Sequence, residues 1–214
     1  MPTSNPYQLN ELMELIILSK PKSILDIGTG FGKYGVLSRE YLEFYDEQDN
    51  YLDWKRRIDG IEAFGVYLTP MHDFIYDNIY VGNAINVLPT LDIKYDLILI
   101  IDVLEHFDYE EGVKLLEICE KVGKNIIIST PLRVGNQKGS FGNPYETHRS
   151  QWRKRDFDRF TDKCFIYNDR SLICYMGKGA HGLKHSRRSR FKLGIKILFP
   201  ILASLRRLMK NKSK

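Results

Sequence analysis

Three alternating glycines near the N-terminus form the strongest chemical signal in the chain. An apolar stretch containing Asp26 runs directly into Gly28, Gly30 and Gly32. Glycines at this spacing let a backbone pass close beneath a nucleoside cofactor and turn at once into a helix. The same residues, shifted by two, also match the dinucleotide pattern Gly30-x-Gly32-x-x-Gly35. The glycines therefore predict a nucleoside-cofactor site and leave the choice of cofactor open.

Carboxylates and histidines further along the chain supply the other reactive groups. Glu62 closes one apolar run, and the segment 102–107 (Asp-Val-Leu-Glu-His-Phe) follows a longer one. A carboxylate offers only acceptors, so Glu62 suits the two hydroxyls of a ribose. A histidine titrates near neutrality and can remove a proton from a hydroxyl acceptor. We expect His148, and in second place His106, to be this base; a purely structural histidine is the alternative at either position.

Helix and strand signals alternate along the chain and place these groups at strand ends. Strands are predicted at 23–27, 57–62, 78–82, 95–101, 125–129, 163–167 and 171–176, and helices at 9–17, 32–44, 68–76, 108–122 and 151–160. The run 95–101 is almost entirely apolar, as expected of a parallel strand covered on both faces. The last two strands are close enough in sequence to form a hairpin. We predict an α/β fold with a doubly wound, mostly parallel seven-stranded sheet that ends in a C-terminal antiparallel hairpin.

Length and composition indicate one domain with an appendage. The 214 residues, 43% of them hydrophobic, suffice for one well-buried domain. The three cysteines show no paired spacing, and no histidines stand at ligand spacing beside them, so we predict neither disulfides nor a metal site. No secretory leader pattern is present at the N-terminus, and we expect a cytoplasmic protein.

Charge divides the chain into an acidic body, 1–177, and a basic tail, 178–214. The tail holds 12 of the 32 basic residues and no acid, which leaves 20 basic against 27 acidic side chains in the body. The stretch 191–210 is basic and amphipathic, but it is too interrupted to span a membrane. We expect it to lie on an anionic membrane surface at the inner face; docking on the domain and contact within an oligomer are the alternatives. We do not expect a nucleic-acid partner, because the body is acidic.

Taken in order, the motifs resemble those of class I S-adenosylmethionine-dependent methyltransferases. The resemblance covers about residues 7–177 and rests on the stretch 25–32, Glu62, the segment 102–107 and the closing hairpin. S-adenosylmethionine carries an ammonium and a sulfonium, which a carboxylate at a strand tip attracts and a phosphate-binding loop does not. The resemblance therefore favours S-adenosylmethionine over a dinucleotide.

The resemblance implies a role for each residue of the cofactor site. Asp26 would receive the amino group of the cofactor, directly or through water, and Glu62 would accept both ribose hydroxyls. Asn83 offers a donor and an acceptor to the edge of adenine. The expected cofactor-binding residues are Asp26, Gly28, Thr29, Gly30, Gly32, Glu62, Asn83, Ala84, Asp102 and Val103.

A long loop, 132–150, resembles the loop that covers the active site in small-molecule and envelope-glycan methyltransferases. The likeness lies in the spacing Pro144-x-Glu-x-His-x-x-x-Trp, and long loops inside compact domains are commonly functional. It implies methyl transfer to oxygen or nitrogen of a small or lipid-linked acceptor, such as a sugar or envelope precursor. The expected substrate-binding residues are Glu105, Tyr145, Glu146 and Trp152.

Two other functions stay open at this stage. One is a non-catalytic module that keeps the cofactor pocket and is recruited to a partner or membrane by its basic tail. The other is a nicotinamide-dependent enzyme that uses the dinucleotide pattern. The motifs name neither the acceptor nor the oligomeric state.

Overall fold

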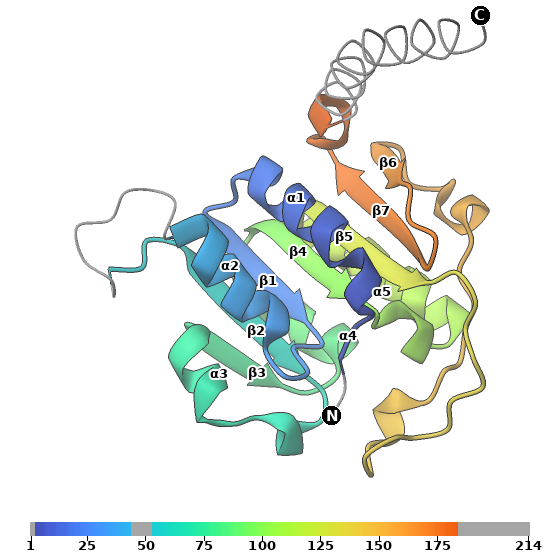
Figure 1. The fold of residues 1–214 in the computed structure, drawn as a ribbon, viewed down its shortest axis with the longest axis horizontal. Helices are drawn as coiled ribbons and strands as arrows, with labels where there is room; N and C mark the ends of the chain where they lie inside the picture. Colours follow the sequence, from blue (N-terminus) through green and yellow to red (C-terminus); the bar gives the residue numbers. More distant parts are fainter. Residues whose placement is uncertain (1–2, 44–52, 184–214) are drawn as a thin grey trace, which may run out of the picture.

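A seven-stranded sheet forms the centre of the protein (Figure 1) in the computed structural model, which describes residues 3–43 and 53–183. Its strands are β1 (Ser23–Ile27), β2 (Arg57–Glu62), β3 (Asn78–Val81), β4 (Tyr95–Ile101), β5 (Gly123–Pro131), β6 (Lys163–Ile166) and β7 (Ser171–Gly177). Their order is β3-β2-β1-β4-β5-β7-β6. Strands β1 to β5 pair in parallel, and β7 is antiparallel to both of its neighbours. The predicted fold class is confirmed.

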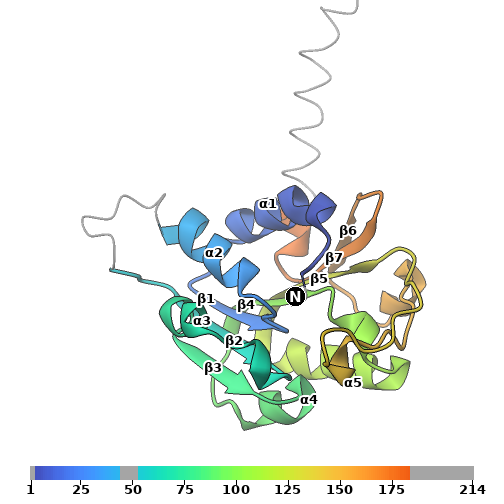
Figure 2. The same cartoon turned by 60° about the horizontal axis from the view of Figure 1, so that its bottom comes forward.

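Helices cover both faces of the sheet (Figure 2). They are α1 (Leu9–Ser19), α2 (Lys33–Glu43), α3 (Pro70–Ile75), α4 (Ala84–Val87) and α5 (Tyr109–Val122). Side chains of α1, α2 and α3 share one buried cluster with Ile24 of β1, whereas α4 and α5 share the other with Leu25. Successive strand residues point to opposite faces, so a strand buried on both sides must be apolar throughout. This explains the unbroken apolar run of β4.

The site forms where the chain changes direction across the sheet. β1 and β4 are neighbours, but the chain continues from β1 to β2 on one side and from β4 to β5 on the other. Such a switch point leaves a crevice at the carboxyl ends of the strands, where ligands bind in open α/β sheets. The N-terminal segment and the loop 132–150 reach this same end (Figure 1).

One predicted helix is wrong. The stretch 151–160 contains only a single 3-10 turn, η7 (Lys154–Phe157), preceded by extended backbone at Arg153. Trp152 and Phe157 are both buried in the same cluster. Residues five apart point to different sides of an α-helix, so a regular helix could not bury both. A short helix that was not predicted, α4, follows Asn83 instead.

The described part of the tail is packed on the domain. Ala180 and Leu183 are buried in the cluster that contains α1, so packing continues past Gly177, the predicted end of the domain. The basic amphipathic stretch 191–210 lies outside the described residues. Among the helices that the structure describes, none is both long and apolar enough to cross a membrane.

Candidate active site

A cavity of about 590 Å³ opens at the carboxyl ends of the parallel strands. It is walled by the turn after β1, the ends of β2 and β4, the N-terminal segment and the loop 132–150. The predicted site residues that line it are Gly28, Thr29, Gly30, Glu62, Asn83, Ala84, Asp102, Val103, Glu105, His106, Tyr145, Glu146 and His148. Three predicted residues, Asp26, Gly32 and Trp152, are not among its lining residues.

The turn after β1 needs glycine for its backbone angles and for space. Gly28 has φ +74°, a conformation that is strained for other residues, and its N–H donates to Ile61 O of β2 at 2.8 Å. A Cβ at Gly28 would stand 2.5 Å from Val103 Cγ2. Gly32 has φ +82° and donates to Thr29 O, so it shapes the start of α2 without reaching the cavity. The turn and the end of β4 are thus packed too closely for a side chain between them.

Glu62 is held in place by the backbone around it. Its Oε2 accepts from Gly30 N and its Oε1 from Phe64 N, each at 2.9 Å. The residue is 5% exposed and lines the cavity, and this burial raises the pKa of its carboxyl. The glycine turn and the acid of β2 are therefore one hydrogen-bonded unit, with the carboxylate fixed at the cavity wall.

Asn83 caps the short helix α4. Its Oδ1 accepts from Ile85 N at 3.0 Å, which commits the acceptor of the side chain to the helix end. Asn83 and the neighbouring Ala84 both line the cavity. The group that Asn83 can still offer to a ligand is its amide NH₂, a donor.

Asp26 is placed differently from the prediction. Its carboxylate is buried on the face covered by α2 and α3, where Oδ2 accepts from the Tyr76 hydroxyl at 2.7 Å. Burial, offset by this hydrogen bond and reinforced by the charge of Glu62, raises the pKa of Asp26 to about 6. The Asp26 side chain therefore lies in the interior next to the glycine turn and does not line the cavity.

The buried Asp26 predicts a pH effect on stability. Its pKa is about 6 in the folded protein against an ordinary value of 3.8, so folding favours the protonated form. This contribution is complete below about pH 4 and is lost as the pH rises through about 6, by up to about 3 kcal/mol. Asp26→Asn, which keeps an acceptor for Tyr76, is expected to flatten the decline of the unfolding free energy across this range, measured by urea denaturation. The exposed Asp73→Asn should leave the decline unchanged; an equal effect of both variants would contradict this assignment.

Asp102 binds residues that were not predicted to belong to the site, including two from the N-terminal segment. Its Oδ2 accepts from Asn5 N at 2.9 Å and from Gln8 Nε2 at 2.7 Å, and its Oδ1 accepts from Ser129 Oγ. The N-terminal segment is thereby drawn to the cavity, and Lys33 donates to Ser4 O there. In the sequence, Lys33 directly after Gly32 was the one residue that could have indicated this side of the cavity. Asp102 acts chiefly as an anchor for the N-terminal segment.

The loop 132–150 closes the far end of the cavity. Arg149 N and Ser150 N both donate to Glu105 O, at 2.8 and 3.1 Å, and so tie the loop to the short turn η5 (Leu104–His106). His106 and His148 come to lie with ring centroids 5.1 Å apart. Burial raises the pKa of Glu105 to about 8 and lowers that of His106. The two predicted bases and Glu105 therefore form a single group at the far end.

Tyr145 and Glu146 lie in the same loop. Glu146 Oε1 accepts from the Tyr67 hydroxyl at 3.4 Å, and burial raises the pKa of Glu146. Tyr145 is exposed at the cavity edge, as is Phe141. Both predicted residues therefore line the cavity on the side of the loop.

The prediction that Trp152 binds substrate is wrong. The side chain is 1% exposed, its Nε1 donates to Ser150 Oγ at 2.8 Å, and its ring stacks on Tyr109 of α5. Gly112 of α5 leaves the space that the ring fills, because a Cβ there would collide with it. Trp152 is a core residue that anchors the C-terminal end of the loop. Its aromatic ring fills space in the core.

Comparison with known proteins identifies the fold. No protein-family model and no curated protein matches the sequence. Solved structures match in fold. An O-methyltransferase family protein from Burkholderia thailandensis has 10% identity and a TM-score of 0.54, over 78% of this chain and 55% of its own. The N-terminal domain of EvdMO1, solved in the presence of SAH and D-fucose, has 12% identity and a TM-score of 0.58. The match covers 82% of this chain and 84% of the EvdMO1 domain chain.

A third solved structure widens the range of substrates found with this fold. The rRNA methylase of Escherichia coli has 15% identity and a TM-score of 0.52, over 80% of this chain and 64% of its own. The chain thus spans less than two thirds of the length of two of these neighbours. At these identities the likeness establishes one property of the chain: it has the class I S-adenosylmethionine-dependent methyltransferase fold.

Proposed function

We propose that this protein is an S-adenosylmethionine-dependent methyltransferase that acts on an oxygen or nitrogen of a small polar acceptor. The observation that carries the proposal is one cavity that joins the glycine turn and Glu62 at one end to His106 and His148 at the other. In methyl transfer the acceptor lone pair forms the new bond to carbon while the old carbon–sulfur bond breaks, so both partners must be in line. A continuous cavity of this kind suits that requirement.

The cofactor end supports S-adenosylmethionine. Glu62 presents a fixed carboxylate for the ribose hydroxyls, and Asn83 presents an amide donor for the adenine edge. The presence of SAH in the EvdMO1 structure adds support from a protein of the same fold. In this arrangement Asp26 acts on the cofactor through the turn and through its negative charge.

The other end supports a polar acceptor. Glu105, Glu146 and His148 line it, and EvdMO1 was solved with D-fucose, which favours a sugar or sugar-like molecule. A hydroxyl acceptor needs a base, and His148 is our first choice for it and His106 our second. A lipid-linked acceptor at an anionic membrane surface is supported only by the composition of 191–210. The open cavity under the loop does not favour a non-catalytic module.

Calorimetric titration with S-adenosylmethionine tests the cofactor assignment. Glu62→Gln is expected to weaken binding about ten- to a hundredfold, because an amide cannot accept from both Gly30 N and Phe64 N and carries no charge. Glu146→Gln is the matched control, since this glutamate also lines the cavity but belongs to the loop, and its replacement should leave the cofactor affinity unchanged. Saturable binding of NADH with none of S-adenosylmethionine by the unmodified protein would overturn the proposal.

The transfer of a labelled methyl group tests the acceptor. Soluble and membrane fractions of cells, supplied separately with labelled cofactor, should gain label in one fraction; label in the membrane fraction would support a lipid-linked acceptor. If His148 is needed for transfer, His148→Ala should bind the cofactor normally and transfer far more slowly. A transfer rate equal to that of the unmodified protein would exclude His148 from the reaction.

A further inference from the structure

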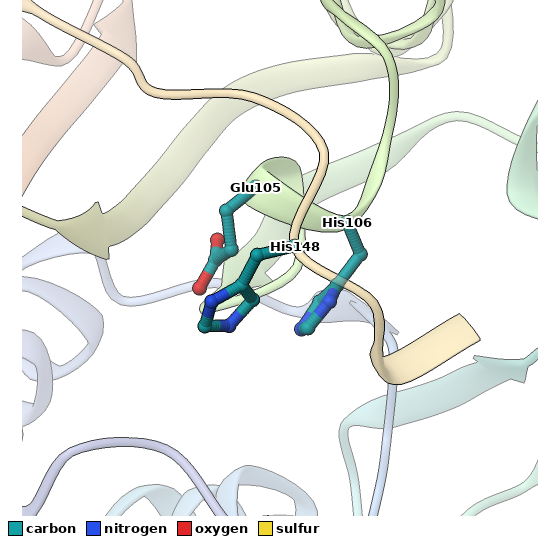
Figure 3. A group of neighbouring side chains, drawn as sticks. All are labelled: Glu105, His106 and His148. Atoms are coloured by element: carbon teal, nitrogen blue, oxygen red, sulfur yellow. The ribbon is translucent and has the colours of Figure 1, made fainter. Parts of the chain in front are cut away.

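Glu105, His106 and His148 bring three potential metal-ligating atoms together (Figure 3). One such atom from each side chain lies within 4.8 Å of the others. Glu105 and His106 belong to the turn after β4, whereas His148 comes from the loop 132–150. No metal site was predicted from the sequence, because His148 is far from Glu105 and His106 in the chain and only the folded loop brings the three together.

Both histidines are oriented as metal ligands are. His106 Nδ1 lies 3.2 Å from Thr147 O, and His148 Nδ1 lies 2.7 Å from Gly135 O. A carbonyl oxygen can only accept, so each Nδ1 carries the proton and each Nε2 keeps its lone pair. A metal-bound histidine has the same arrangement, with its outer N–H held by a carbonyl or carboxylate.

Glu105 provides an independent indication. Its side chain is 1% exposed, and its Oε2 has no hydrogen-bond partner among the described residues. A buried polar oxygen without a partner is costly. A cation held between the Glu105 carboxyl group and the two imidazole rings would give this group a partner.

We propose that Glu105, His106 and His148 bind a divalent transition-metal ion, such as Zn²⁺ or Mn²⁺, that holds the methyl acceptor. Two imidazoles and one carboxylate suit these ions better than Mg²⁺ or Ca²⁺, which prefer oxygen ligands. The three residues all line the cavity, so the remaining coordination positions are open to a ligand from that side. The role toward the acceptor rests on the proposed function, whereas the binding of the ion does not.

A bound ion would change the chemistry assigned to His148. A hydroxyl bound to a divalent cation loses its proton more readily, and the proton can pass to water. The resulting alkoxide would form its bond to the methyl carbon as the carbon–sulfur bond breaks and the electron pair returns to sulfur. His148 would then be a ligand to the ion, and the separate histidine base would not be needed.

Direct metal binding by the full-length protein tests this site. The chelator-treated protein is titrated with ZnCl₂ or MnCl₂ by calorimetry, and Co²⁺ is used as a visible-absorption probe. We expect the unmodified protein to bind one ion more than His148→Ala does, and Glu105→Gln to weaken binding at that site at least about tenfold. His181→Ala is the matched control, because this exposed histidine pairs with Asp162 and does not line the cavity.

A separate titration with SAH keeps the two proposals apart. Glu105→Gln and His148→Ala should still bind SAH, which also shows that they are folded. Equal metal binding by the unmodified protein, Glu105→Gln and His148→Ala would overturn the metal site and leave the cofactor assignment standing. Metal binding that depends on Glu105 and His148 in a protein that binds no SAH would uphold the site and overturn the proposed function.

Discussion

Gly28→Ala is expected to weaken the binding of S-adenosylmethionine strongly. The backbone at Gly28 has φ +74°, which costs about 1–2 kcal/mol for an L-residue, and the new Cβ would stand 2.5 Å from Val103 Cγ2. Relief of this overlap requires the turn after β1 to move away from the end of β4, and both line the cavity. We expect the affinity to fall at least about tenfold, measured by calorimetry.

Two further variants separate strain from collision. Gly142 has nearly the same φ, +73°, but a Cβ there meets nothing within 4 Å. Gly142→Ala should therefore cost backbone strain alone and retain cofactor affinity. Adding Val103→Ala to Gly28→Ala should restore part of the affinity by making room. If Gly142→Ala lowers the affinity as much as Gly28→Ala does, close packing at the cofactor turn is not the cause.

Trp152→Ala is expected to be the most destabilising of the substitutions considered for this chain. Its ring is 1% exposed and packs against Tyr109 and Phe157, and removal of a buried aromatic side chain typically costs about 3–5 kcal/mol. We expect a decrease of this size in the free energy of unfolding, measured by urea denaturation. The loop 132–150 would also lose its C-terminal anchor, so proteolysis within it should become faster.

Tyr145→Ala is the control for this prediction. Tyr145 is an aromatic residue near the end of the same loop, but it is 46% exposed, so its removal should change stability by less than about 0.5 kcal/mol. It should instead alter the affinity for the acceptor, because Tyr145 lines the cavity. A loss of stability as large in Tyr145→Ala as in Trp152→Ala would contradict the distinction between core and site.

The two ends of the cavity differ in how they are built. The cofactor end consists of strand ends and a glycine turn whose backbone is tied to Glu62. The end proposed to hold the acceptor depends on the loop 132–150, which is held by two hydrogen bonds to Glu105 O and by the burial of Trp152. Because loops vary more readily than the scaffold that carries them, the acceptor end is where proteins of this fold can differ in substrate.

The order of the motifs was enough to predict the fold, and most of the expected cofactor-binding residues line one cavity. Strand ends in a doubly wound sheet converge at one edge, so Gly28, Glu62 and Asn83 could be placed together from local patterns alone. The alternation of helices and strands likewise predicted the parallel sheet and its closing hairpin, since both follow from local periodicity.

Tertiary packing decided the rest, because it depends on contacts between residues far apart in the chain. Asp26 and Trp152 have the residue types expected at a site, yet Tyr76 and Tyr109 hold them in the interior. The N-terminal segment is held at the cavity by Asp102, which accepts from Asn5 and Gln8, and by Lys33, which donates to Ser4. No local pattern encodes these contacts, and the grouping of Glu105 with two histidines also required the folded loop.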